Sequence, residues 1–189
     1  MRQALFLDRD GVINHDSGYV YRKEDFVFIQ GIFEVVELAN RLGYLVIVVT
    51  NQAGIGRGYY STQQFSELME WVRKSFEPHG GLAEVYFCAD HPVFGLGQYK
   101  RESEDRKPNP GMILRAAREF DLDLNRSFLV GDKQTDIQAG YKAGIRNLFL
   151  FDSVDQADNC TRISELVEVK PFLLSQSAPS GSTNFEPIN

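Results

Sequence analysis

The stretch "ALFLDRDGV", residues 4–12, decides the fold class because it joins a short apolar run directly to two aspartates and a glycine. The run from Ala4 to Leu7 has the length and composition of a buried β-strand. Beyond it, Asp8 and Asp10 point the same way in an extended chain, so both can meet one ligand. Gly11 then allows a sharp turn. We therefore predict a strand that ends at a polar site.

Four further β-rich runs follow, and most are continuously apolar, which is typical of strands covered on both faces. They lie at residues 44–50, 83–88, 127–131 and 147–151.

Segments with helical periodicity lie between these runs. Their signals are apolar periodicity over 32–42, a capping box from Ser61 to Gln64, an N-cap at Asn109 before Pro110 with a helix through Phe120, a helix over 135–143 ended by Gly144, and a final helix over 163–174. Because strands alternate with helices, we predict right-handed crossovers and a doubly wound, Rossmann-like α/β fold with a parallel sheet.

The length and net charge of the chain limit the classes of function that it can have. With 189 residues and a formal net charge of −6, the chain suits one domain and has no basic field for a phosphate backbone. We expect one domain over 1–174, a flexible Ser/Gly/Pro-rich tail over 175–189, and a monomer. The amino terminus resembles neither a signal peptide nor a membrane span, and two cysteines do not make a disulfide framework. We therefore expect a cytoplasmic protein with a small-molecule substrate and neither nucleic-acid nor membrane partners.

Polar groups follow three of the predicted strands, where ligands bind in such folds. Asp8 and Asp10 follow the first, Thr50 the second and Asp132 the fourth. Carboxylate oxygens suit Mg²⁺, which completes its shell with waters and phosphate oxygens. A lysine before a helix start, Lys107, could neutralise phosphoryl oxygens. Of two such carboxylates, one can attack phosphorus while the other moves the proton.

Each of these residues also has an ordinary structural interpretation. Asp8 and Asp10 could cap a turn, Asp132 could cap the following helix, and Lys107 could be a solvated surface lysine. The stretch "NQAGIGRGYY", residues 51–60, fails the dinucleotide spacing G-x-G-x-x-G and lacks a Walker lysine, so we expect a flexible substrate loop. Arg57 in this loop suits a second phosphate or a sugar hydroxyl, and a solvated arginine is the alternative.

Four ordered motifs resemble those of the haloacid dehalogenase (HAD) superfamily over residues 5–151: "DRDGV", "VVTNQ", "RKPNPG" and "GDKQTD". The resemblance implies that Asp8 is the nucleophile and a Mg²⁺ ligand, and that Asp10 is the acid/base and binds the metal through its carbonyl. It also implies that Asp132 completes the metal site, while Thr50, Asn51 and Lys107 hold the phosphoryl group.

Within the superfamily, "DSGYV", "TNQAGIGRG" and "FCADHP" are most similar to the family of D-glycero-D-manno-heptose-1,7-bisphosphate 7-phosphatases. The resemblance implies hydrolysis of the 7-phosphate of a sugar bisphosphate. Histidinol-phosphate phosphatases are the alternative family, and a non-catalytic sugar-phosphate-binding module is an alternative of another class. The implied substrate contacts are Asp16, Ser17, Gly18, Tyr19, Asn51, Gln52, Ala53, Arg57, Arg106 and Lys133.

One loop departs from the family pattern. The family commonly holds a structural zinc, and the corresponding residues here are Cys88, Asp90, Ser103 and Asp105. Structural zinc strongly prefers complete Cys/His sets. Half a site from Cys88 and His91, with Glu102 or Glu104, is the alternative. We expect no zinc, and we expect His91 to be a hydrogen-bonded loop residue.

The same loop, residues 89–106, must then be held by other means, and we expect docking of Phe94, Leu96 and Tyr99 on the body of the domain. Neither this loop nor residues 11–32 has room for a cap domain. We therefore expect a capless, open site whose specificity comes from loops. An open site leaves an extended substrate, such as a phosphoprotein or a nucleic-acid end, as an alternative.

Overall fold

The computed structural model describes residues 1–177. Within these residues, six strands form one sheet in the order β3-β2-β1-β4-β5-β6, and every neighbouring pair is parallel. The strands are β1 (Ala4–Leu7), β2 (Leu45–Asn51), β3 (Glu84–Cys88), β4 (Phe128–Gly131), β5 (Asn147–Phe151) and β6 (Thr161–Ile163). The predicted doubly wound parallel sheet is confirmed.

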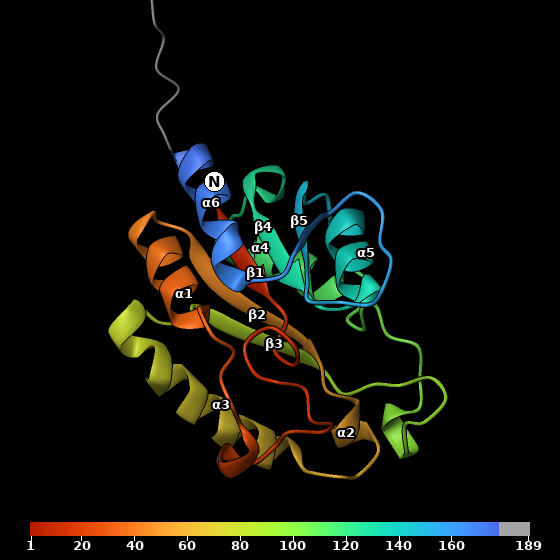
Figure 1. Cartoon of the computed structure of the whole chain (residues 1–189). Coiled ribbons are helices and arrows are strands. Elements are labelled where there is room, and N and C mark those ends of the chain that lie inside the picture. The colour runs from red at the N-terminus through yellow and green to blue at the C-terminus, as the bar shows by residue number, and fades with distance from the viewer. Residues whose placement is uncertain (178–189) are drawn as a thin grey trace, which may run out of the picture.

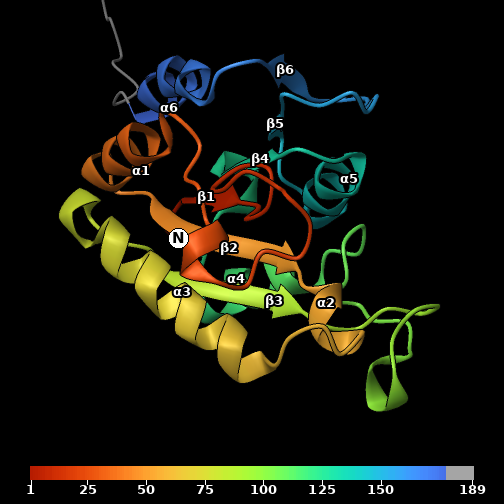
Figure 2. The same ribbon diagram turned by 60° about the horizontal axis from the view of Figure 1, so that its bottom comes forward.

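Helices cover both faces of this sheet (Figures 1 and 2). Helices α1, α3 and α6 pack on one face, and α4 and α5 pack on the other. The helices are α1 (Ile32–Arg41), α2 (Ala53–Gly56), α3 (Thr62–Phe76), α4 (Gly111–Phe120), α5 (Gln134–Ala143) and α6 (Lys170–Ser177).

Strand β1 lies in the middle of the sheet and contributes to both layers of the core. Leu5 and Leu7 pack in the layer of α1 and α3, whereas Ala4 and Phe6 pack in the layer of α4 and α5. In the sheet, Leu5 pairs with Val46 of β2 on one side and with Phe128 of β4 on the other. A strand buried on both faces needs a continuous apolar sequence, which explains the run at residues 4–7.

Three of the predicted helix boundaries can be compared directly with the structure. The capping box from Ser61 to Gln64 is present at α3, and Gly144 ends α5 with a left-handed φ of 97°. The prediction of Asn109 as an N-cap is wrong, because α4 begins at Gly111 and Pro110 occupies the N-cap position. The amide of Asn109 instead donates to the carbonyl of Ser103 at 3.0 Å, so it holds the preceding loop.

The end of the described chain is more divided than the sequence suggested. The segment predicted as one helix over 163–174 contains the last residue of β6, a 3-10 turn at Leu166–Val169 and the first part of α6. Of the predicted tail, residues 175–177 belong to α6, and residues 178–189 lie outside the described residues.

The two insertions that could carry a cap are short. Residues 11–31 contain the 3-10 turn Lys23–Asp25, and residues 89–110 contain the 3-10 turn Gly97–Tyr99. Within residues 1–177, neither insertion forms a separate cap domain, so the carboxyl ends of the strands stay accessible. In the same part of the chain, the structure contains no helix with the length and apolar character needed to span a membrane.

Candidate active site

A cavity of about 420 Å³ lies at the carboxyl ends of β1, β2 and β4. Most of the predicted site residues line it, although they come from segments far apart in the sequence. They are Asp8, Asp10, Asp16, Gly18, Tyr19, Thr50, Asn51, Gln52, Ala53, Arg57, Arg106, Lys107 and Lys133.

Two predicted residues are not among those that line the cavity. Ser17 is exposed, in a turn where the backbone N–H of Gly18 donates to the carboxylate of Asp16 at 3.0 Å. Asp132 lies beside Asp8 at the base of the site, in the acidic cluster described next.

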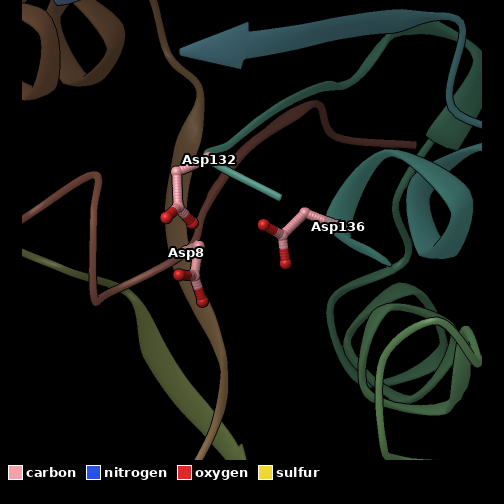
Figure 3. A group of neighbouring side chains, drawn as sticks. All are labelled: Asp8, Asp132 and Asp136. Atoms are coloured by element: carbon pink, nitrogen blue, oxygen red, sulfur yellow. The ribbon is translucent and has the colours of Figure 1, made fainter. Parts of the chain in front are cut away.

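Three carboxylates converge at the base of the site, as Figure 3 shows. One oxygen from each of Asp8, Asp132 and Asp136 lies within 4.8 Å of the others. Asp136 was not in the predicted metal set, and the carboxylate of Asp10 does not belong to this cluster. Because hard oxygen donors in this number suit a divalent cation, the cluster is a candidate metal centre.

Two glycines make room for this cluster. A Cβ on Gly11 would lie 2.2 Å from the Oδ2 of Asp132, and the φ of Gly11 is 94°. A Cβ on Gly131 would lie 2.2 Å from the Cβ of Asp136. The absence of a side chain at Gly11 therefore allows Asp132 to approach, and its absence at Gly131 allows Asp136 to approach.

The electrostatics of the cluster favour a bound cation. Burial, with the nearby carboxylates, raises the pKa of Asp8 to about 7 even though Lys107 opposes the shift. Burial likewise raises the pKa of Asp132 to about 6. The Oδ1 of Asp132 is buried and has no hydrogen-bond partner within residues 1–177. A divalent ion would satisfy this oxygen and offset the repulsion, so the residues fit such a group.

Lys107 is a buried cation that links the acidic residues. Its Nζ lies 2.5 Å from the Oδ1 of Asp8 and 2.7 Å from the Oδ1 of Asp136. It also donates to the carbonyl of Val49 at 2.8 Å. Burial would lower the pKa of Lys107, but the charges of Asp136 and Asp8 raise it overall, so this lysine stays protonated. The interpretation of Lys107 as a solvated surface residue is therefore wrong.

Asn51 fixes the backbone of Lys107. Its Oδ1 accepts from the Lys107 N–H and its Nδ2 donates to the Lys107 carbonyl, both at 3.0 Å. This pair of bonds joins β2 to the loop before α4 and places the lysine beside Asp8.

The turn-cap interpretations of the aspartates also fail. The side chain of Asp8 binds Lys107, and that of Asp10 accepts hydrogen bonds from other side chains. Helix α5 has Lys133, not Asp132, at its N-cap position, and the Lys133 N–H donates to Asp136 at 3.0 Å.

The rim of the cavity carries cationic and aromatic side chains. The guanidinium of Arg57 lies 4.4 Å from the ring centroid of Phe94 and 5.7 Å from that of Tyr19. The Nε of Arg57 is buried without a hydrogen-bond partner in the described part of the chain. Lys133 pairs with Asp16 at 3.1 Å, and this pairing outweighs burial and lowers the pKa of Asp16.

The predicted flexible loop at residues 51–60 is instead partly helical. Residues 53–56 form α2, with Gly54 and Gly56 buried. A Cβ on Gly54 would lie 2.2 Å from the ring of Tyr60, and one on Gly56 would lie 2.3 Å from the carbonyl of Ala89. These glycines therefore permit close packing of the turn against neighbouring groups.

The loop over residues 89–106 is held chiefly by polar contacts. Asp90 pairs with Arg101 at 3.0 Å, and Asp105 pairs with Arg115 at 3.0 Å. The thiol of Cys88 donates to the hydroxyl of Ser103 at 3.6 Å. Three of the family's zinc-ligand positions are thus occupied by residues that make ion pairs and hydrogen bonds.

Only part of the expected hydrophobic docking of this loop occurs. Tyr99 packs against the core, but Phe94 and Leu96 are 55% and 62% exposed. Leu96 contributes through its backbone, since its N–H donates to the carbonyl of Gly56 at 2.8 Å. His91 is a hydrogen-bonded loop residue, as predicted, because its Nδ1 accepts from two backbone N–H groups.

Several lining residues were not predicted as site residues. They are Gly54, Tyr60, His91, Thr135 and Asp136. The signal for Asp136 was present in the sequence, because a residue in the first turn of the helix after β4 faces the same strand end as Asp132. Tyr60 had no comparable signal, since a tyrosine before a capping box is an ordinary core residue.

Comparisons with known proteins agree with this geometry. A family model described as HAD-hydrolase-like matches residues 105–169. A D-glycero-α-D-manno-heptose-1,7-bisphosphate 7-phosphatase of Burkholderia mallei is 54% identical over 185 residues, 95% of this chain and 98% of that protein. A D-glycero-β-D-manno-heptose-1,7-bisphosphate 7-phosphatase of Vibrio cholerae is 46% identical over 145 residues, 76% of this chain and 78% of that protein.

A solved structure has the same fold. The D,D-heptose 1,7-bisphosphate phosphatase of B. bronchiseptica, complexed with magnesium and phosphate, superposes with a TM-score of 0.80 at 25% identity. The match covers 92% of this chain and 99% of that one. The fold, the acidic site and the extent of identity lead to one conclusion: this chain belongs to the heptose-1,7-bisphosphate 7-phosphatase family of HAD-like hydrolases.

Proposed function

We propose that this protein hydrolyses the 7-phosphate of D-glycero-D-manno-heptose 1,7-bisphosphate through an aspartyl-phosphate intermediate on Asp8. The observation that carries the proposal is the position of Asp8, which lines the cavity, contacts the Nζ of Lys107 and belongs to the acidic cluster. A carboxylate held beside a fixed cation can attack a phosphoryl group whose charge that cation neutralises.

In the first step, an oxygen of Asp8 forms a bond to phosphorus and the bond between phosphorus and the sugar oxygen breaks. Asp10 gives its proton to the leaving sugar oxygen. In the second step, Asp10 takes a proton from water, whose oxygen attacks phosphorus and releases inorganic phosphate, which regenerates Asp8. Thr50 and Lys107 hold the phosphoryl oxygens in both steps.

We propose Mg²⁺ as the cofactor, held by Asp8, Asp132 and Asp136 and by the carbonyl of Asp10. The buried, unpartnered oxygen of Asp132 supports this assignment. When bound, the ion would offset negative charge at the phosphoryl group and the carboxylates. The chain's own residues provide the nucleophile, the acid/base and the lysine.

We propose that the second phosphate and the sugar contact the rim of the cavity. Arg57, Arg106 and Lys133 place cationic groups around the opening. Arg106 is oriented by its Nη1, which donates to the carbonyl of Asp90 at 3.1 Å. The other proposed substrate contacts are Asp16, Ser17, Gly18, Tyr19, Asn51, Gln52 and Ala53.

We propose the α-anomer as the preferred substrate. The relative that acts on the α-anomer is 54% identical over 95% of this chain, whereas the Vibrio cholerae relative that acts on the β-anomer is 46% identical over 76%. The test is kcat/KM for both heptose bisphosphate anomers and for histidinol phosphate, because this ratio measures transition-state discrimination. Faster turnover of histidinol phosphate would contradict the substrate assignment.

The catalytic role of Asp8 is tested by Asp8→Asn. This variant keeps the shape of the side chain but lacks the nucleophilic carboxylate, so turnover should fall to background while the circular dichroism spectrum stays unchanged. Retained turnover would exclude the mechanism. Tight binding of the bisphosphate without hydrolysis by the unmodified protein would favour the sugar-phosphate-binding module instead.

We also propose that the protein acts as a cytoplasmic monomer. The proposed nucleophile, acid/base and lysine, which are Asp8, Asp10 and Lys107, all line the same cavity of a single chain. Sedimentation at assay concentration measures the oligomeric state, and cell fractionation measures the compartment.

A further inference from the structure

The carboxylate of Asp10 is surrounded by hydrogen-bond donors. Its Oδ1 accepts from the Nη2 of Arg9 at 2.6 Å and from the Nδ2 of Asn14 at 3.1 Å. Its Oδ2 accepts from the Nε2 of Gln52 at 2.9 Å. A carboxylate offers about four lone-pair sites, so the donors found among residues 1–177 leave one site, on Oδ2, for a proton. Asp10 lines the cavity, where that proton can be passed to a substrate oxygen.

Both the nitrogen and the oxygen of the Gln52 side-chain amide make hydrogen bonds. Its Nε2 donates both to Asp10 and to the Oγ1 of Thr50, the latter at 2.8 Å. Its Oε1 accepts from the hydroxyl of Tyr60 at 2.5 Å. An amide oxygen and an amide nitrogen have nearly the same shape, so hydrogen bonds alone decide which of them faces Asp10.

Tyr60 is itself rigidly held. Only 5% of its surface is exposed, and the ring of Tyr21 stacks on it at a centroid distance of 5.1 Å. The backbone of Gly54 also packs against the ring of Tyr60, so closely that a Cβ on Gly54 would lie 2.2 Å from the ring. Burial raises the pKa of Tyr60 to about 12, so its hydroxyl remains a donor.

We infer that Tyr60 is a positioning residue for Asp10 and acts through the amide of Gln52. Because the hydroxyl of Tyr60 occupies Oε1, the amide must present its NH₂ group to Asp10 in both protonation states of that carboxyl group. Without the hydroxyl, the amide can turn and present Oε1, which would accept the proton of Asp10 in competition with the leaving oxygen. The inference rests on the proposed function, in which Asp10 is the acid/base.

Tyr60→Phe removes only the hydroxyl and keeps the packed ring. We expect kcat on the heptose bisphosphate to fall about tenfold, which is the size of one lost orienting hydrogen bond, with KM changed less than about twofold. Tyr44→Phe is the matched control, because Tyr44 is equally buried but lies before β2, at the other end of the sheet. This control should keep full activity.

Two further measurements separate positioning from a general structural effect. The first turnover of p-nitrophenyl phosphate should keep its wild-type rate in Tyr60→Phe, because p-nitrophenolate leaves without a proton. In a double-mutant cycle, Tyr60→Phe should cause no further loss in a Gln52→Ala background, because its effect passes through the missing amide.

A full tenfold loss in the Gln52→Ala background would overturn the inference, and so would equal losses on both substrates or an unchanged kcat in Tyr60→Phe. A wild-type protein that releases no phosphate from the heptose bisphosphate, or an Asp10→Asn variant with full activity, would overturn the proposed function and the inference together. The two failures are therefore distinguishable by the wild-type and Asp10→Asn rates.

Discussion

At the scale of the residue, the central feature is a buried lysine between two buried carboxylates. Lys107 contacts Asp8 and Asp136, and all three side chains are almost fully buried. Removing one member of this buried ion-pair cluster should lower the free energy of unfolding, because it leaves the other charges without compensation in a medium of low dielectric. The same arrangement that stabilises the fold therefore holds the proposed nucleophile in place.

Lys107→Met should affect both catalysis and stability. We expect kcat to fall at least about 100-fold, as for the loss of one group that stabilises transition-state charge. We also expect a loss of about 3 kcal/mol in the free energy of unfolding at pH 8. The loss should be smaller at pH 5.5, because burial raises the pKa of Asp8 to about 7 and its unpaired carboxyl group takes up a proton there.

Urea denaturation at the two pH values measures this difference. Lys74→Met is the control, because Lys74 is an exposed lysine whose one ion pair among residues 1–177 is with Glu70 of the same helix. The unfolding midpoint of this variant should not change. An equal loss of stability at both pH values would contradict the account of the buried charges.

The sequence predicted the residues that stand in motifs, but not those defined by packing. Asp8, Lys107 and Asp132 follow strands or precede a helix, so their place at one edge of a parallel sheet follows from the fold class alone. Tyr60 reaches the site only because Gly54 lets its ring approach. Such a contact depends on a three-dimensional fit between side chains and leaves no periodic signal.

At the scale of the element, the strands were predicted more accurately than the irregular segments. Strand β1 has a continuous apolar sequence because both of its faces are buried, and its predicted bounds agree with the structure. Strand β6 was missed because its three residues, Thr161–Ile163, lie at the edge of the sheet and only Ile163 is buried. Asn109 was misassigned because its amide binds the loop before α4 rather than the helix terminus.

The loop over residues 89–106 should depend on ion pairs. Asp90→Asn removes the pair with Arg101 and loosens the segment whose carbonyl orients Arg106. We expect KM for the heptose bisphosphate to rise about fivefold, which corresponds to one weakened hydrogen bond, while kcat stays within about twofold. Glu104→Gln, an exposed change in the same loop, is the control and should leave both constants unchanged.

We further expect a zinc-selective chelator to leave activity and the unfolding midpoint unchanged, because Asp90, Ser103 and Asp105 already have protein partners. Near-stoichiometric zinc that survives chelation would contradict this expectation.

At the scale of the whole molecule, stability should couple to pH and to Mg²⁺ through the acidic cluster. The pKa of Asp8 is raised to about 7 and that of Asp132 to about 6, from an unperturbed value of 3.8. Between about pH 4 and about pH 7, the folded chain therefore binds more protons than the unfolded chain. The free energy of unfolding of the metal-free protein should fall as the pH rises through this range.

Mg²⁺ binds the deprotonated carboxylates, so it should raise the unfolding midpoint more at pH 7.5 than at pH 5. Thermal unfolding with Mg²⁺ and with EDTA measures both effects. Asp136→Asn should abolish most of the difference between the two conditions. A midpoint that does not respond to Mg²⁺ at pH 7.5 would contradict the proposed metal centre.

The most direct test of the account is the chemical identity of the intermediate. The protein is mixed with the heptose bisphosphate and Mg²⁺, quenched within one turnover and reduced with borohydride, which converts an aspartyl phosphate to homoserine. We predict, by peptide mass spectrometry, homoserine at position 8 and unmodified aspartate at positions 10, 132 and 136. Release of the 7-phosphate at the normal rate with unmodified aspartate at position 8, or with homoserine at another position, would contradict the assignment of Asp8 as the nucleophile.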